Sequence, residues 1–167
     1  MRISAGVRQL FERDDGSLPD IHVCNLTSEQ IVLIYEWLMS QCSIARDPTL
    51  WNIALDQDVP IRETSQPARA FVSGTVASFR HCLANLSIDG VALPELSVCL
   101  EDGGLSFDYR MGPEWGDSEV QALLELFTRI MVLAPNAAIS RTDEGVDVIA
   151  SPEFATALAE QACARES

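Results

Sequence analysis

Residues that commonly carry out catalysis are few in this chain and lie apart in its sequence. The two histidines, His22 and His81, stand alone in their segments, whereas a metal site needs several converging ligands. His81 and Cys82 are adjacent, so on a helix they would point about 100° apart. A nucleophilic pair such as Cys24 with His81 has no local sequence signature to support it. The sequence therefore predicts no catalytic residue, no metal site and no cofactor.

Pairs of acidic residues are common, but their neighbours do not suit catalysis. Asp56 and Asp58 have the spacing to hold a divalent cation with phosphate, yet the basic residue and glycine loop used in phosphoryl transfer are missing beside them. No dinucleotide-binding, Walker, nucleophile-elbow, zincin or EF-hand motif occurs. A small hydrolase or transferase stays an open alternative, on condition that His22, His81 and Cys82 or Asp56 converge on one pocket.

Net charge is the strongest signal in the sequence. Twenty-five acidic residues oppose eleven basic ones, all of them arginine, and give a formal net charge of −14. Nucleic acids and phosphate-rich membranes are bound through basic patches, so we expect neither as a partner. Between Asp89 and Glu119, eight acids accompany one base, a surplus of seven and half of the net charge. This concentration of acids predicts a basic protein partner.

The cysteines and the apolar segments indicate the compartment. Five cysteines, an odd number with no C-x-x-C pair, are typical of reduced thiols and not of a disulfide framework. No apolar stretch approaches the ~20 residues needed to span a bilayer. Residues 1–16 also lack the apolar core of a secretory signal. We therefore expect a cytoplasmic protein that does not bind membranes.

Local patterns predict the elements that position the acidic residues. Residues 96–100 and 105–109 alternate between apolar and polar side chains around an acidic turn that contains glycine, which predicts a β-hairpin. In this hairpin Asp102 and Asp108 are expected to be exposed. Thr27 and Gln30 form the pattern of a capping box, so a helix should begin there. The other expected elements are a strand over 21–26, a helix over 67–86, a helix from 118 to 134, a second hairpin over 138–150 and a helix over 152–163.

These elements predict an α+β fold. An antiparallel sheet built largely from two hairpins would carry about four helices, packed mainly on one of its faces. The length fits a single domain over residues 1–167. We expect the N-terminal segment 1–19 to be loosely attached and the tail 164–167 to be frayed.

Trp115 lies in a loop bounded by glycine and proline, between the predicted hairpin and the next helix. One interpretation is an aromatic plug that closes the end of the core. The other is an interface anchor, because an aromatic side chain ringed by carboxylates suits a basic groove on a partner. On the second interpretation the partner-binding residues are Glu101, Asp102, Asp108, Glu114, Trp115 and Asp117.

The hairpin over 96–111 and the loop from Trp115 to Asp117 also carry a resemblance to known proteins. In size, charge and architecture the chain resembles bacterial immunity proteins, the small acidic inhibitors encoded beside toxins. The resemblance implies an inhibitor that covers the active site of a cognate toxin, a nuclease or another enzyme with a basic cleft. A secretion chaperone for an effector is an alternative, and acidic mimicry of nucleic acid is a third. The sequence leaves the oligomeric state open.

Overall fold

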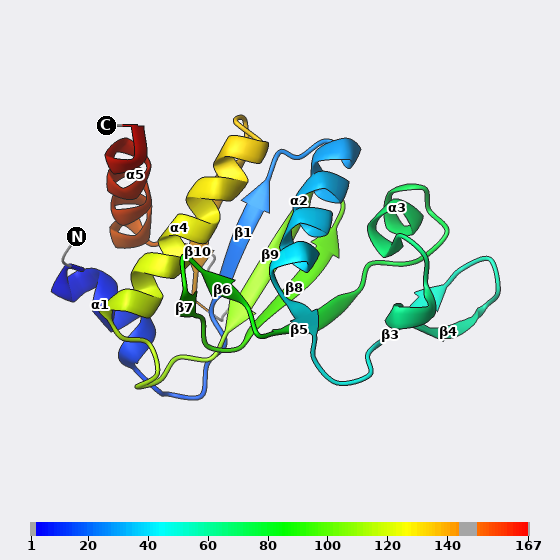
Figure 1. The fold of residues 1–167 in the computed structure, drawn as a ribbon, viewed down its shortest axis with the longest axis horizontal. Helices are drawn as coiled ribbons and strands as arrows, with labels where there is room; N and C mark the ends of the chain where they lie inside the picture. The colour runs from blue at the N-terminus through cyan, green and yellow to red at the C-terminus, as the bar shows by residue number, and fades with distance from the viewer. Residues whose placement is uncertain (1–2, 144–149, 167) are drawn as a thin grey trace.

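A six-stranded antiparallel sheet forms the centre of the fold in the computed structural model, which describes residues 3–143 and 150–166 (Figure 1). Two small hairpins lie outside this sheet. Across the sheet the strands are β10 (Ala138–Thr142), β1 (Asp20–Cys24), β9 (Gly104–Tyr109), β8 (Leu96–Glu101), β5 (Arg80–Ala84) and β2 (Ser43–Ile44). The small hairpins are β3 (Thr49–Asn52) with β4 (Gln57–Pro60) and β6 (Ser87–Ile88) with β7 (Val91–Ala92).

Helices cover one face of the central sheet. In Figure 1, α2 (Ser28–Gln41) and α4 (Asp117–Leu133) both cross that face. α1 (Ala5–Glu12) and α5 (Pro152–Glu166) pack beside α4 at one end. At the other end α3 (Pro67–Val72) packs on α2, preceded by the 3-10 turn η1 (Ile61–Glu63). The predicted α+β class is confirmed. None of the described helices is long and apolar enough to cross a bilayer.

Side-chain alternation along the strands separates a helix-covered apolar face from an open polar face. In β9, Leu105, Phe107 and Tyr109 are buried under the helices, while Ser106 and Asp108 point to the other face. This period of two is typical of an antiparallel sheet with one face toward solvent. The sheet therefore separates the polar side chains of the open face, such as Asp108, from the few on the covered face, such as His81.

Two locally encoded elements form as the sequence predicts. The Thr27 hydroxyl accepts a hydrogen bond from the Gln30 amide at 3.2 Å, and the Gln30 side chain accepts one from the Thr27 amide at 2.9 Å. This capping box begins α2 and is confirmed. The hairpin of β8 and β9 is confirmed as well, with Leu96 opposite Tyr109 and Leu100 opposite Leu105.

The segment 67–86 does not form the helix that its apolar spacing predicts. α3 ends at Val72, Gly74 adopts a φ of +79°, and the chain then extends into β5. β5 is a strand because it pairs with β8 on one side and β2 on the other. Sheet pairing of this kind overrides local propensity, and it buries Leu83 on the covered face.

The first strand of the second expected hairpin is present as β10. β10 pairs with β1, with Asp20 opposite Thr142 and Cys24 opposite Ala138. Most of the expected return strand, residues 146–150, lies outside the described residues. Within them, Ala150 forms an isolated bridge with Thr142. The sheet therefore gains its outer strand β10 through pairing with the N-terminal strand β1.

Residues 3–12 are packed onto the core, in contrast to the loose attachment expected for residues 1–19. Phe11 is fully buried and stacks on Tyr109, with 4.9 Å between ring centroids. The Tyr109 hydroxyl donates a hydrogen bond to the Leu10 carbonyl at 2.9 Å. At the other terminus, α5 extends to Glu166, beyond residue 164 where fraying was expected to begin.

Candidate partner-binding site

The six residues predicted to bind a partner do not form one patch. Glu101 and Asp102 lie at the turn of the β8–β9 hairpin, whereas Asp108 lies near its opposite end. Asp108 lies opposite Ser97, and Glu101 is four positions further along β8, a distance of about 14 Å at roughly 3.4 Å per residue. Glu114 and Asp117 follow in the chain after β9 ends. The structure therefore divides the predicted site between two ends of one hairpin.

Trp115 is a core residue and not an exposed anchor. Its side chain is only 1% exposed and packs against Phe11 and Tyr109, each with 5.3 Å between ring centroids. The indole N–H donates to the Arg110 carbonyl at 2.8 Å, which satisfies the polar end of the ring. This geometry agrees with the aromatic-plug interpretation. The prediction that Trp115 contacts a partner directly is wrong, because its side chain is buried.

Two of the predicted acids are held by arginines within the chain. Asp108 accepts two hydrogen bonds from Arg80, at 2.7 and 2.6 Å, and its side chain is 17% exposed. Asp117 accepts a hydrogen bond from Arg8. Arg80 and Arg8 thus neutralise charges that the sequence analysis assigned to a partner. Asp102 and Glu114 are exposed and have no ion pair within the described part of the chain.

The residues of the enzyme alternative do not converge. His22 lies on the open face of β1 and is hydrogen-bonded to Thr142 at 3.0 Å. His81 lies on the covered face, is hydrogen-bonded to Tyr35 at 2.9 Å, and has its pKa lowered by burial. Cys82 shares the open face with His22, but β9 and β8 stand between their strands. The described residues contain no group of three metal-ligating side chains.

A pocket of about 360 Å³ on the open face of the sheet gathers charged residues. It is lined by Arg46, Arg80 and Arg110, among others. Arg46 pairs with Glu95 at 3.2 Å, and Arg80 pairs with Asp108. Because these arginines are already bound to carboxylates, the pocket is a neutralised polar network and not a free anion site.

Ion pairing leaves the surface with uncompensated negative charge. Every arginine in the described ranges forms an ion pair with a carboxylate. Acids outnumber arginines, so many carboxylates are left over. Within the described residues, the exposed acids without an ion pair include Asp56, Asp58, Glu63, Asp102, Glu114 and Glu160. These unpaired carboxylates would attract a positively charged surface.

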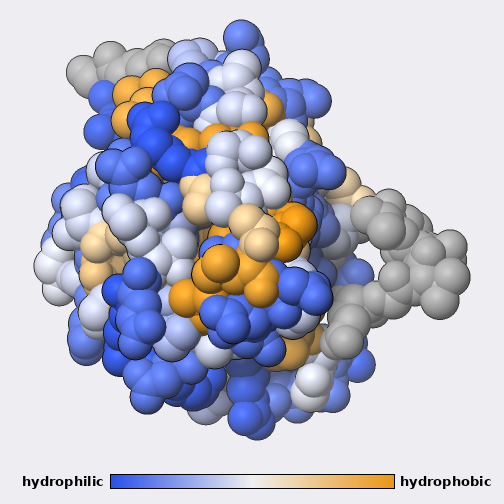
Figure 2. Space-filling view, turned by 90° about the vertical axis from the view of Figure 1, so that its right-hand side faces the viewer, coloured by the Kyte–Doolittle hydropathy of each residue, from blue (hydrophilic) through white to orange (hydrophobic). Residues whose placement is uncertain are grey.

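The β3–β4 hairpin exposes apolar side chains that the sequence analysis did not place. Trp51, Ile53 and Leu55 are 43%, 53% and 60% exposed, and they are three of the six large apolar residues exposed in the described part. Trp51 lies opposite Asp58. Figure 2 views this end of the molecule and shows apolar side chains gathered among hydrophilic ones. The sequence signal that could have identified this surface is the apolar content of the short turn 53–56, which ends in Asp56.

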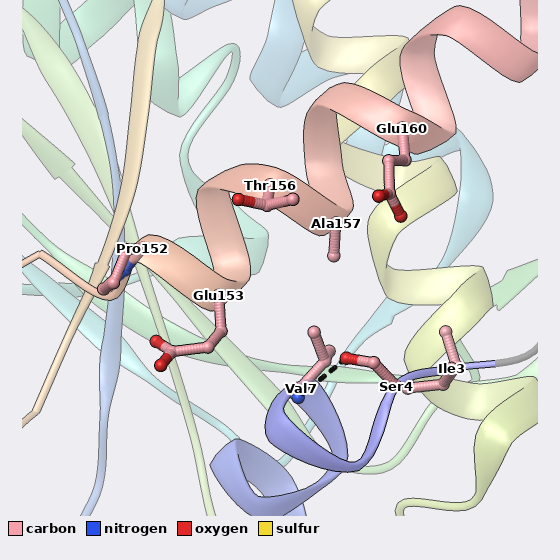
Figure 3. A pocket seen from close by; sticks show the side chains of 8 residues that line it. All are labelled: Ile3, Ser4, Val7, Pro152, Glu153, Thr156, Ala157 and Glu160. Atoms are coloured by element: carbon pink, nitrogen blue, oxygen red, sulfur yellow. Dashed lines mark hydrogen bonds between the residues drawn. The ribbon is translucent and has the colours of Figure 1, made fainter.

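A second pocket, of about 410 Å³, lies between α1 and α5 (Figure 3). Ala157 of α5 points toward Val7 near the start of α1, and Glu160 points toward the segment that carries Ile3 and Ser4. The Ser4 hydroxyl caps α1 by accepting from the Val7 amide at 3.3 Å. Glu153 and Glu160 line this pocket together with the hydroxyl-bearing Ser4 and Thr156, and no basic side chain is among its described lining residues. The pocket is the space left between the packed helices α1 and α5.

Comparison with solved structures places this fold beside one chain of a toxin complex. The match is to the crystal structure of the toxic C-terminal tip of CdiA from Pseudomonas aeruginosa in complex with an immune protein. The TM-score is 0.51, the sequence identity is 14%, and the match covers 77% of this chain and 86% of the other. The likeness is one of fold. No protein-family model and no curated protein sequence matches the chain.

The shared fold does not identify a binding surface, so the candidate site is drawn from this chain's own geometry. Its acidic residues lie on several parts of the surface, and the arginines that the structure describes are paired. Among the exposed regions, the β3–β4 hairpin combines apolar side chains with Asp56 and Asp58, which have no ion pair in the described part. Interfaces typically combine an apolar centre with a polar rim in this way.

Proposed function

We propose that this chain is an immunity-type protein that binds and neutralises a basic protein toxin. The observation that carries the proposal is the likeness of its fold to one chain of a complex between a toxin tip and an immune protein. At 14% identity the likeness concerns the fold. The chemistry of the partner is therefore inferred from this chain's own charges.

The charge balance supports a basic partner. The formal net charge is −14, and the described arginines are bound to carboxylates of the same chain. An acidic protein attracts a cationic one over distances of about a Debye length, roughly 8 Å at physiological salt. Such attraction raises the rate of association and disfavours acidic partners.

Inhibition by covering a partner's active site requires a surface and not a catalytic centre. His81 lies on the covered face, and His22 and Cys82 lie on strands of the open face that β9 and β8 separate, which supports this assignment over a hydrolase or transferase. Asp102 and Glu114, which are exposed, contribute to the electrostatic field that guides the partner. Asp108 and Asp117 contribute less, because arginines neutralise them.

A growth assay tests the proposal. Each gene next to the one encoding this chain is expressed from an inducible promoter, alone and together with this chain. We expect one neighbour to arrest growth and this chain to restore it, because the two proteins form a stable complex. Gel filtration of the co-expressed pair then gives the stoichiometry.

Two results would contradict the proposal. One is that no neighbouring gene arrests growth, and the other is that growth stays arrested when this chain is present. The electrostatic part has a separate test, the association rate measured by stopped flow at low and at high ionic strength. A rate independent of salt would exclude electrostatic guidance.

A further inference from the structure

We propose that the β3–β4 hairpin is the surface with which the chain binds its partner, an inference that rests on the proposed function above. Trp51, Ile53 and Leu55 would enter an apolar recess on the partner. Asp56 and Asp58 would meet arginine or lysine side chains at the rim of that recess. The sequence analysis assigned binding to other residues, around the β8–β9 hairpin and Trp115.

The first argument is the concentration of exposed apolar surface. Trp51, Ile53 and Leu55 lie within five residues of one another and are between 43% and 60% exposed. The other large exposed apolar residues of the described part, Leu18, Leu33 and Val132, are dispersed over the sequence. Single exposed apolar residues are normal, whereas clusters rimmed by polar residues mark interaction sites.

The second argument is that this exposed hairpin has a fixed backbone. The Ala77 amide donates to the Trp51 carbonyl at 3.0 Å, and the Ile53 amide donates to the Thr75 carbonyl at 2.9 Å. Leu50, on the inner side of β3, is only 2% exposed and anchors the hairpin in the core. A segment whose backbone is held in position before binding loses less entropy in the complex.

The third argument is charge. Trp51 and Asp58 are direct neighbours across the hairpin, and Asp56 lies in its turn. Neither carboxylate has an ion pair among the described residues. An aromatic side chain beside free carboxylates is complementary to a cationic surface with an apolar recess. A second copy of this chain would bring another −14 to the interface, so the charges favour a basic partner over self-association.

The test uses the neighbouring gene product whose toxicity this chain relieves, purified in inactive form as the binding probe. The first variant combines Trp51→Ala with Leu55→Ser, and its control is Val132→Ser on α4, where Val132 is 64% exposed. We expect the double variant to bind at least about 30-fold more weakly, because central aromatic anchors dominate interface energies. The control should bind within about twofold of the wild type. Thermal unfolding verifies that both variants fold.

A second pair of variants separates charge position from total charge. Asp56→Asn with Asp58→Asn and Glu153→Gln with Glu160→Gln each remove two of the acids, so both change the formal net charge from −14 to −12. We expect the hairpin pair to slow association by about tenfold at low ionic strength and the α5 pair by about twofold.

The outcomes distinguish the two proposals. If the wild type relieves toxicity and both hairpin variants bind like it, the hairpin inference is wrong and the proposed function stands. If the wild type relieves no toxicity, the proposed function fails and the inference fails with it. If wild-type dimers become monomers when Trp51 and Leu55 are replaced, the hairpin serves self-association, which also overturns the inference.

Discussion

The loop that carries Trp115 and the hairpin that carries Trp51 each place a tryptophan close to a turn, with opposite exposure. Both tryptophans stand near acids and turn residues. Trp115 is 1% exposed and Trp51 is 43% exposed. The difference arises from Phe11 of α1, which packs over Trp115 from a position about a hundred residues away in the sequence. Trp51 has only its backbone fixed by residues 75–77.

This comparison teaches that flanking acids do not determine whether an aromatic side chain is exposed. A tryptophan is buried when a distant apolar element arrives to cover it and a polar group accepts its N–H. For Trp115, both requirements are met by Phe11 and by the Arg110 carbonyl. The exposed tryptophan of the hairpin is therefore the better candidate for an interface, and the buried one is the better candidate for stability.

The largest expected effect is on stability, from truncating the two tryptophans. Trp115→Ala removes a buried ring and leaves a cavity, so the free energy of unfolding should fall by about 3–5 kcal/mol. Trp51→Ala should change it by no more than about 0.5 kcal/mol, as is usual for surface substitutions. Urea denaturation followed by circular dichroism measures both.

A conservative variant controls for cavity formation. Trp115→Phe keeps most of the ring volume and removes the N–H donor to Arg110, so the loss should be smaller than for alanine. Acrylamide quenching of fluorescence gives an independent check, since replacing Trp51 should lower the quenchable emission more than replacing Trp115, with the half-buried Trp37 common to both variants. Equal losses of stability for Trp51→Ala and Trp115→Ala would contradict the comparison.

The next effect compares two acids of the β8–β9 hairpin that the sequence analysis treated alike. Asp108→Asn breaks the paired hydrogen bonds with Arg80 and should cost about 1–2 kcal/mol, a figure reduced because Arg80 is half exposed. Asp102→Asn touches no ion pair and should be neutral within about 0.5 kcal/mol. Urea midpoints of the two variants measure the difference, and a cost for Asp102→Asn as large as that for Asp108→Asn would refute it.

Elements with local signals were predictable from the sequence. α2 begins with a capping box whose two partners, Thr27 and Gln30, are three residues apart. The hairpin of β8 and β9 has a short turn between alternating strands. Both signals act within a few residues, so pattern and structure agree. The confirmed α+β class follows from such elements.

The elements that depend on distant partners were not predictable in the same way. Residues of β5 carry apolar side chains at spacings that also suit a helix, and pairing with β8 and β2 decides between the two. Likewise β10 pairs with β1, more than a hundred residues earlier in the chain. For the site, burial of Trp115 required knowledge of Phe11, which no local pattern supplies.

The smallest expected effect comes from His81, which lies on the covered face of the sheet. Burial lowers the pKa of His81 below its usual value of 6.5. The unfolded chain therefore binds a proton at a pH where the folded chain does not, and unfolding is favoured as pH falls below about 6.5. The stability contributed by neutral His81 is complete above that pH and is lost as pH falls through the lowered pKa.

His81→Gln should weaken this pH dependence, because it removes the buried imidazole. Urea midpoints measured at about pH 7.5 and about pH 5.5 give the comparison. The quantity to compare is the change in midpoint between the two pH values, so a loss of stability common to both conditions does not affect it. An identical change in the wild type and His81→Gln would show that other groups, and not the buried histidine, cause the loss of stability in mild acid.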